Sequence, residues 1–293
     1  MRKASALSRL VAPLIAVGVL SVGCGQAAPS PQPSTTAGQP APAAAPGEAA
    51  AASKSKKAVQ QAPVNLPVGT VYRNPATGRD EVIVGDVRHT AVLIGDSQSQ
   101  PSNSWPRQAL KACGYEVYFA GMGGTGFVAS NGKTGNYIDA LQRGDWLLPY
   151  GAPPLIVIQG GGNDAAHGAT DAQIVANAER LITAIKARYP GAKIAMIGTL
   201  ARGANYGGGR RTQVDTLLGH VAERAGLAFI SVGDWLSKYN AVQDLVDGTH
   251  MTQTGHNKLA VVLTKELTAA GFTLQPANGR VSDTLGLVTP AAQ

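Results

Sequence analysis

The stretch HTAVLIGDS, residues 89–97, joins a continuous apolar run to an abrupt polar ending. The apolar residues 91–94 lack the polar alternation of a half-exposed strand, which is typical of a strand buried on both faces. Gly95 ends the run, and Asp96 and Ser97 follow at once. Ligands of open α/β sheets bind beyond the carboxyl ends of the strands. The stretch therefore predicts a buried strand whose end carries polar groups in a functional position.

Strand-like and helix-like segments alternate along the chain after this stretch. The clearest helix covers 170–191, where Thr170 and Gln173 fit a capping box and apolar residues recur at helical spacing. Such alternation implies right-handed crossovers and a parallel sheet covered on both faces. We predict an α/β fold with three layers, α/β/α, around a flavodoxin-like parallel sheet of about five strands. The further expected strands are 115–121, 153–161, 192–200 and 227–232, and the expected helices are 105–114, 136–151, 170–191, 211–226 and 254–271.

Residues 1–24 have the composition of an export signal, with basic residues ahead of an apolar run from Leu10 to Val22. The small residue Gly23 directly before Cys24 resembles a bacterial lipoprotein signal, in which Cys24 would carry lipid. Ser21 stands where that signal usually has leucine, so secretion without lipid is the alternative. We expect an exported protein, either lipid-anchored at the outer face of the cell membrane or secreted.

The rest of the chain divides by composition. Residues 25–66 are rich in Ala and Pro with almost no large apolar side chains, which predicts a disordered linker. Residues 67–89 contain two β-rich runs around a turn signal and predict a β-hairpin. The main domain is expected over 90–273, with a C-terminal tail at 274–293.

Charge and apolar content exclude several classes of protein. The net charge of +7 comes largely from the first 66 residues, because residues 67–293 carry 19 basic and 17 acidic side chains. A nucleic-acid partner is therefore not expected. No apolar run approaches 18 residues, which excludes a protein with several membrane spans. Cys113 and Trp235 are expected in the core.

The glycine-rich stretch AGMGGTGFVASNGKTG, residues 120–135, contains fragments of two nucleotide-binding motifs. A P-loop would need glycine where Phe127 stands. A GxGxxG motif must open a helix, but Asn-Gly and Thr-Gly pairs follow this one. We therefore expect no nucleotide. No HExxH motif or Cys/His cluster occurs either, so no metal and no other cofactor are expected.

Polar groups instead follow several strands of the expected sheet and would meet at one edge. Ser97 follows the first strand, the glycine stretch the second, and Asn163 the third, while Asp247 and His250 precede the last helix. A serine hydroxyl becomes nucleophilic when an imidazole accepts its proton, and a carboxylate must orient that imidazole. Glycine N–H groups and an asparagine amide can stabilise an oxyanion. This set of groups indicates acyl transfer chemistry.

The same residues resemble the SGNH, or GDSL, serine hydrolase superfamily. Its four blocks occur in order between about Thr90 and Gly271, as GDS, a glycine in GGTG, GGND and DGTH. The resemblance implies that Ser97 is the nucleophile, His250 the general base and Asp247 its orienting carboxylate.

The resemblance also implies an oxyanion hole made by the Ser97 N–H, the Gly124 N–H and the Asn163 side chain. Gly124 is preferred over Gly123 because the family's glycine is commonly followed by a small polar residue, here Thr125.

The residues after the serine depart from the family, because Gln98, Ser99 and Gln100 replace a hydrophobic residue and a glycine. The GDSQ form looks closer to cell-surface members, including SGNH domains attached to acyltransferases. An exported serine esterase acting on an acylated small molecule, lipid or envelope glycan is our first hypothesis. A cell-surface O-acyltransferase and a non-catalytic envelope-binding lipoprotein are the alternatives.

Some neighbouring residues have weaker assignments. In the loop ARGANYGGGRR, residues 201–211, Arg202 and Tyr206 are possible substrate-binding residues, and Arg210 is a further candidate. Asp164 is expected to brace the loop of its neighbour Asn163 by accepting backbone hydrogen bonds. His256 is expected only to begin the last helix.

Overall fold

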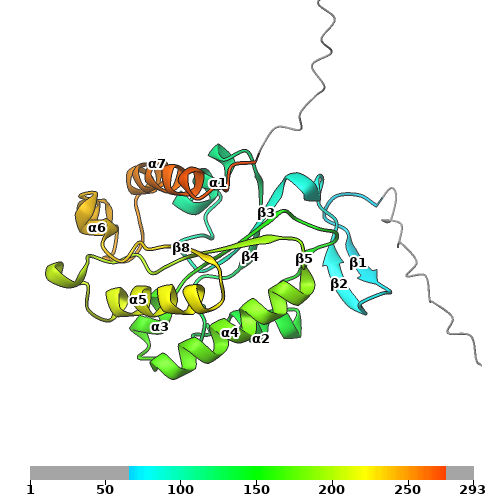
Figure 1. Ribbon diagram of the computed structural model, residues 1–293, viewed down its shortest axis with the longest axis horizontal. Coiled ribbons are helices and arrows are strands. Elements are labelled where there is room, and N and C mark those ends of the chain that lie inside the picture. Colours follow the sequence, from blue (N-terminus) through cyan, green and yellow to red (C-terminus); the bar gives the residue numbers. More distant parts are fainter. Residues whose placement is uncertain (1–65, 275–293) are drawn as a thin grey trace, which may run out of the picture. The chain divides into compact units, whose positions relative to one another are not determined.

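The computed structural model describes residues 66–274 (Figure 1). The expected signal peptide at 1–24 with Cys24, the linker at 25–66 apart from its last residue, and the tail at 274–293 apart from its first residue lie outside the described residues. Within 66–274, no helix combines the length and apolar character needed to cross a membrane.

A five-stranded, all-parallel sheet forms the centre of the fold. Its strands lie in the order β4-β3-β6-β7-β8, so the first strand of the sheet in sequence lies between the second and the third. This is the flavodoxin-like order, and the predicted fold class is confirmed. The strands are β3 (Thr90–Gly95), β4 (Glu116–Gly121), β6 (Leu155–Gln159), β7 (Lys193–Ile197) and β8 (Ala228–Ile230).

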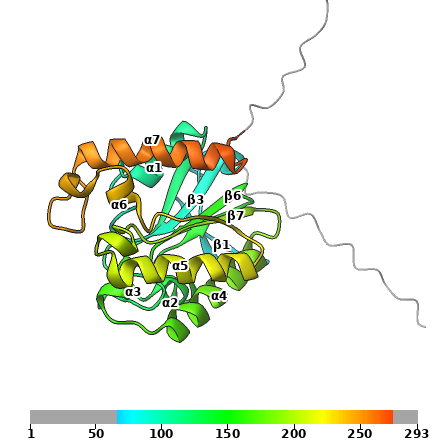
Figure 2. The ribbon, with the colours of Figure 1, turned by 60° about the vertical axis from the view of Figure 1, so that its left-hand side comes forward.

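Helices cover both faces of this sheet (Figure 2). Successive side chains of a strand point to opposite faces, so Leu93 packs on one side and Ile94 on the other. The Leu93 face is covered by α1 (Trp105–Ala112) and α7 (Gln253–Ala269), with the short α6 (Trp235–Lys238) beside them. The Ile94 face is covered by α2 (Tyr137–Arg143), α4 (Asp171–Arg188) and α5 (Gly209–Arg224).

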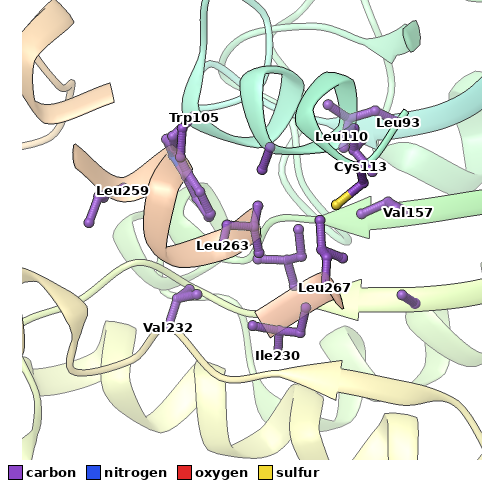
Figure 3. Close-up of a cluster of buried hydrophobic side chains, with 14 of the residues drawn as sticks. Leu93, Trp105, Leu110, Cys113, Val157, Ile230, Val232, Leu259, Leu263 and Leu267 are labelled. Carbon is purple, nitrogen blue, oxygen red and sulfur yellow. The ribbon is translucent and has the colours of Figure 1, made fainter. Parts of the chain in front are cut away.

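A cluster of buried hydrophobic side chains lies beneath α7 and joins it to α1 and the sheet (Figure 3). Leucines of α7 pack between α1 and the sheet, and Trp105 of α1 contacts Trp235 with ring centroids 5.9 Å apart. Cys113 is fully buried as a free thiol, and Trp235 is 2% exposed, as expected for core residues. This packing fixes the start of α7, and therefore the loop that precedes it, against the end of β3.

The predicted helix over 136–151 is wrong in its second half. The helix α2 ends at Arg143 because Gly144 adopts a left-handed conformation (φ 78°), which closes the helix. The chain then forms β5 (Leu148–Pro149), which pairs with β2 (Arg79–Val82) of the N-terminal hairpin. Together with β1 (Val71–Asn74), these strands make a second, three-stranded sheet. The predicted capping box of α4 is present.

Candidate active site

Ser97, His250 and Asp247 come together beyond the carboxyl ends of the strands. Ser97 is the second residue after the end of β3, whereas His250 and Asp247 lie in the loop before α7. The His250 Nε2 atom lies 3.0 Å from Ser97 Oγ, and His250 Nδ1 lies 2.7 Å from Asp247 Oδ2. Both distances are within hydrogen-bonding range, so the three predicted residues form a continuous Ser-His-Asp relay.

A tight turn holds the histidine and its carboxylate in register. Leu245 and Met251 form an antiparallel bridge, and Gly248 adopts a left-handed φ of 80° between them. Asp247 Oδ1 accepts the N–H groups of Thr249 at 3.0 Å and His250 at 2.8 Å. These N–H groups and the His250 ring hold the pKa of the Asp247 carboxyl well below its usual range. The carboxylate therefore stays charged and faces the imidazole.

Two pockets meet at Ser97. The outer pocket has a volume of about 500 Å³, and its lining includes Ser97, Gln100, His250, Met251 and His256. The inner pocket is much smaller, about 10 Å³, and its lining includes Ser97, Asn163, Leu200, Arg211 and Thr249. Ser97 thus lines both a roomy pocket shared with the histidine and a confined pocket shared with the asparagine.

Asp164 braces a different segment from the one expected. Its carboxylate accepts the N–H groups of Phe127 at 2.9 Å, Val128 at 2.7 Å and Ala129 at 2.8 Å, all in the glycine-rich loop after β4. Residues around Asn163 themselves form the short helix α3 (Gly162–Ala166), and none of their N–H groups donates to the Asp164 carboxylate within residues 66–274. The acceptor role was predicted correctly, but the partner was wrong.

The glycine loop faces Ser97 through Gly123 rather than Gly124. A Cβ added at Gly123 would lie 3.4 Å from Ser97 Cβ, whereas one added at Gly124 would lie 3.3 Å from Asn131 Cβ. The Gly123 N–H donates at 2.6 Å to Gln100 Oε1, and Gln100 lines the outer pocket with Ser97. These contacts favour Gly123 over the predicted Gly124 as the glycine donor.

Asn163 is placed as expected beside Ser97. Its Nδ2 group donates one hydrogen bond to Thr125 O at 2.8 Å, which fixes the amide against the glycine loop. The second amide hydrogen has no partner among the described residues, and Asn163 lines the inner pocket with Ser97. The Ser97 N–H is also without a partner in residues 66–274. Ser97 and Asn163, which follow two different strands, therefore bring two N–H donors to one small pocket.

Gln98 and Asp96 hold the turn that carries Ser97 through hydrogen bonds. Gln98 Nε2 donates to Thr249 O at 2.6 Å and so ties the serine turn to the histidine loop. The Gln98 N–H donates to Asp96 Oδ1 at 2.9 Å, and Asp96 is only 2% exposed. Burial raises the pKa of the Asp96 carboxyl to about 6. Sequence reasoning assigned neither side chain a role.

The structure brings to the site an arginine other than the two candidates, Arg202 and Arg210. Arg202 is exposed and Tyr206 is 68% exposed, and neither lines the two pockets, so their binding role stays a prediction. Arg210 turns away to pair with Asp171 at 2.6 Å. Arg211 lines the inner pocket instead. The sequence contains a signal for this inward position of Arg211, because Arg211 precedes the buried Val214 and Leu218 by three and seven residues on one helical face.

His256 does more than begin α7. Its Nδ1 atom accepts the Trp105 N–H at 3.2 Å, which ties α7 to the first residue of α1, and its ring lines the outer pocket. Burial, together with the nearby His250, lowers the pKa of His256. Within residues 66–274, no three His, Cys, Asp or Glu side chains gather closely enough to hold a metal ion. After the glycine loop, the next helix is α2 at Tyr137, so no helix begins at the GxGxxG stretch.

Fold and site together define a serine hydrolase of the three-layer α/β class. The family description that matches the chain is the GDSL-like lipase/acylhydrolase family, over residues 89–258. This chain belongs to that family and is an ester hydrolase of the SGNH type. The match contains all the residues discussed above as a candidate relay and oxyanion hole.

Solved structures of similar fold include several esterases. An active-site mutant of a family two carbohydrate esterase from Clostridium thermocellum is 16% identical, with 67% of this chain and 69% of that chain aligned at a TM-score of 0.51. A family two carbohydrate esterase from Cellvibrio japonicus is 18% identical over 66% and 64% of the two chains, at a TM-score of 0.49. The protein TesA is 25% identical over 61% and 98%, at a TM-score of 0.45. No curated protein matches this chain in sequence.

Proposed function

We propose that this chain hydrolyses carboxyl esters through an acyl-enzyme on Ser97, with His250 as general base and Asp247 as its orienting carboxylate. The observation that carries the proposal is the relay itself, in which His250 contacts Ser97 Oγ at 3.0 Å and Asp247 Oδ2 at 2.7 Å. Family membership supplies the reaction class. The relay supplies the nucleophile, the general base and the carboxylate that orients the base.

In the first half of the reaction, Ser97 Oγ attacks the ester carbonyl carbon while its proton passes to His250 Nε2. The carbonyl oxygen becomes an oxyanion, which the N–H groups of Ser97 and Gly123 and the free amide hydrogen of Asn163 stabilise. The tetrahedral intermediate collapses when the alcohol leaves with the proton from His250. The acyl group stays on Ser97 as an ester.

In the second half, a water molecule gives a proton to His250 and attacks the acyl carbon, and the acid leaves as Ser97 Oγ regains its proton. An O-acyltransferase would use the same steps with a second alcohol in place of water. The two activities therefore differ only in what enters the outer pocket during deacylation.

The test of the relay needs no knowledge of the substrate. A fluorophosphonate forms a covalent adduct with an activated serine, so we expect one adduct, mapped by peptide mass spectrometry to Ser97. The variants Ser97→Ala and His250→Ala should remain folded by circular dichroism and carry no adduct. A folded wild-type chain that takes up no label would reject the proposal. Product analysis with alcohol acceptors present then separates free acid from transferred ester.

We further propose that the enzyme is exported and held at the outer face of the cell membrane by lipid on Cys24, where it acts on acylated lipids or glycans of the envelope. The basic residues and apolar run of positions 1–22 and the small residue before Cys24 support this location. Expression in a bacterial host fed an alkyne fatty acid should label the wild type but not Cys24→Ala. Label retained in that variant would reject lipidation at Cys24.

A further inference from the structure

The contact between α7 and α1 fixes which ring nitrogen of His256 carries the proton. Trp105 is the first residue of α1, so its N–H has no partner within that helix. The N-cap residue Ser104 forms no side-chain capping bond, and His256 Nδ1 accepts the Trp105 N–H at 3.2 Å instead. Burial, with His250 nearby, lowers the pKa of His256, so the ring is neutral at neutral pH. In a neutral ring whose Nδ1 is an acceptor, the proton lies on Nε2.

The Nε2–H group of His256 is a free donor at the outer pocket. The residue is only 7% exposed, and its Nε2 forms no hydrogen bond within residues 66–274. Nε2 is not among the buried atoms without a partner, so solvent reaches it. Because the Nδ1 edge of the ring faces α1, the opposite edge lines the outer pocket with Ser97 and His250. His256 therefore presents an N–H donor to whatever enters this pocket.

The other polar side chains of the outer pocket, outside the relay, already have partners in the protein. Gln98 Nε2 donates to Thr249 O at 2.6 Å. Gln100 Oε1 accepts the Gly123 N–H at 2.6 Å, and Gln100 is an exposed side chain that can turn aside. The remaining lining residues are apolar, Pro101 and Met251. His256 is therefore the donor of this pocket that is both fixed in place and unpaired within the described part of the chain.

The outer pocket receives the alcohol part of the ester. The leaving alcohol must take its proton from His250 Nε2, which contacts Ser97 Oγ and lines this pocket, so the alcohol departs beside that ring. A second alcohol that accepts the acyl group would enter by the same route. The pocket volume of about 500 Å³ lies within the range of small-molecule sites, so it can hold more of the alcohol than the reacting oxygen.

We propose that His256 donates its Nε2–H to a second oxygen on the alcohol part, and so favours esters of polyhydroxy alcohols such as sugars and glycerol over esters of plain alkyl alcohols. A hydroxyl or ether oxygen accepts this hydrogen bond, whereas an alkyl chain would cover the N–H and leave it without a partner. This inference rests on the proposed acyl-enzyme chemistry at Ser97, and it names the residue that selects the alcohol of that reaction.

The test compares esters that differ in one acceptor oxygen. Methoxyethyl acetate is butyl acetate with an ether oxygen in place of one methylene, and glycerol monoacetate is propyl acetate with two added hydroxyls. Hydrolysis by the full-length chain in detergent is followed by proton NMR. In at least one pair, we expect the kcat/KM ratio of oxygen-bearing to alkyl ester to be about 2- to 10-fold higher in wild type than in His256→Asn, the net value of one neutral hydrogen bond. The variant's own ratio gives the intrinsic difference in reactivity.

The choice of variants separates selection from packing. Asparagine carries an amide oxygen near the position of Nδ1, so His256→Asn keeps an acceptor for the Trp105 N–H and removes the Nε2 donor. Glutamine carries an amide nitrogen near the position of Nε2, so His256→Gln should retain part of the preference. The exposed His220→Asn on α5 should leave rates and preference unchanged. A purely structural role would lower both members of a pair equally in His256→Asn.

The outcomes distinguish this inference from the proposed function. Ratios equal in wild type and His256→Asn for both pairs, with Ser97 labelled by fluorophosphonate, would overturn the role of His256 alone. Ethyl methoxypropanoate and ethyl pentanoate place the oxygen in the acyl part, and a His256-dependent preference confined to that pair would overturn the alcohol-side assignment.

A second measurement needs no turnover. Long-range proton–nitrogen NMR of isotope-labelled histidine in Ser97→Ala should show the Nε2–H tautomer for the signal that His256→Asn removes, and an Nδ1–H tautomer would overturn the inference. If Ser97 takes no label and no ester is hydrolysed, the proposed function fails, and the selection of its alcohol fails with it.

Discussion

Asp164 Oδ1 accepts the N–H of Val128 at 2.7 Å, and this bond joins the two halves of the candidate oxyanion hole. Asp164 is the neighbour of Asn163 on α3, whereas Val128 belongs to the loop that carries Gly123. The Asn163 amide adds a second link by donating to Thr125 O at 2.8 Å. The Asn163 side chain and the loop that carries the Gly123 donor are therefore positioned by the same short helix. Disturbing Asp164 should move both.

We expect Asp164→Ala to lower stability and activity together. The carboxylate is fully buried and accepts three backbone N–H groups, which would be left unpaired. Unpaired buried donors cost about 1–3 kcal/mol each, so the free energy of unfolding should fall by at least about 3 kcal/mol. Urea denaturation measures this loss, and kcat is measured under conditions where the variant is folded. The exposed Asp171→Ala serves as the control, and equal small effects of the two variants would contradict the bracing role.

Asp247→Asn tests whether the carboxylate orients the imidazole. The asparagine keeps the size of the side chain but loses the charge facing His250 Nδ1, so kcat should fall by about 10² to 10⁴ with little change in KM. Initial rates on a neutral aryl ester measure the effect.

The chain contains a matched control for this substitution. Asp86 contacts His89 Nδ1 at 2.7 Å with the same three-residue spacing and accepts the Arg88 N–H at 3.0 Å, and it precedes β3, whereas Ser97 follows the other end of that strand. Asp86→Asn should therefore leave kcat unchanged. A similar loss in both variants would show that the effect of Asp247→Asn is not specific to the relay.

Gln100 competes with the substrate for the oxyanion hole. Its carbonyl oxygen accepts the Gly123 N–H at 2.6 Å, where the proposed mechanism places the oxyanion, so substrate must displace it. Gln100→Ala should raise kcat/KM and the fluorophosphonate labelling rate by about 2- to 10-fold, the net value of one neutral hydrogen bond. Gln100→Glu should lower both, because a carboxylate holds the N–H more strongly and repels the oxyanion. A slower Gln100→Ala enzyme would mean that Gln100 instead helps to hold the loop for catalysis.

The fold and the relay could be predicted because each depends on local signals. The apolar run ending at Gly95 specifies a buried strand, and Asp247 and His250 contact each other within one turn. The end of α2 was missed although Gly144 marks it, because the apolar Leu147 and Leu148 after it continue to suggest a helix. Their partner is the hairpin strand β2, more than 60 residues earlier, and no local pattern reports such a pairing.

The finer parts of the site depend on contacts between segments far apart in sequence. Asp164 and Val128 are 36 residues apart, so the brace between them follows from the crossover geometry rather than from either motif. The choice between Gly123 and Gly124 depends on which of them faces Ser97, which the GGTG sequence does not encode. Arg211 was not predicted either, although its three-residue spacing from the buried Val214 indicates the inward face of the helix.

Asp96 should make the protein less stable as the pH rises from about 4 to 7. Its folded-state pKa of about 6 lies above the ordinary value of 3.8, because burial outweighs the Gln98 N–H and the attraction of Arg211 and His250. The folded protein therefore binds the proton more tightly than the unfolded chain, and the resulting stability, about 3 kcal/mol, is present below pH 4 and lost as the pH passes 6. Asp215 also has a raised pKa and contributes with the same sign, so the comparison must be between wild type and Asp96→Asn. Asparagine keeps an acceptor for the Gln98 N–H, and urea denaturation at pH 4 to 7 should show a flatter profile for this variant. Parallel profiles for the two proteins would mean that the pKa of Asp96 is the same in the folded and the unfolded state.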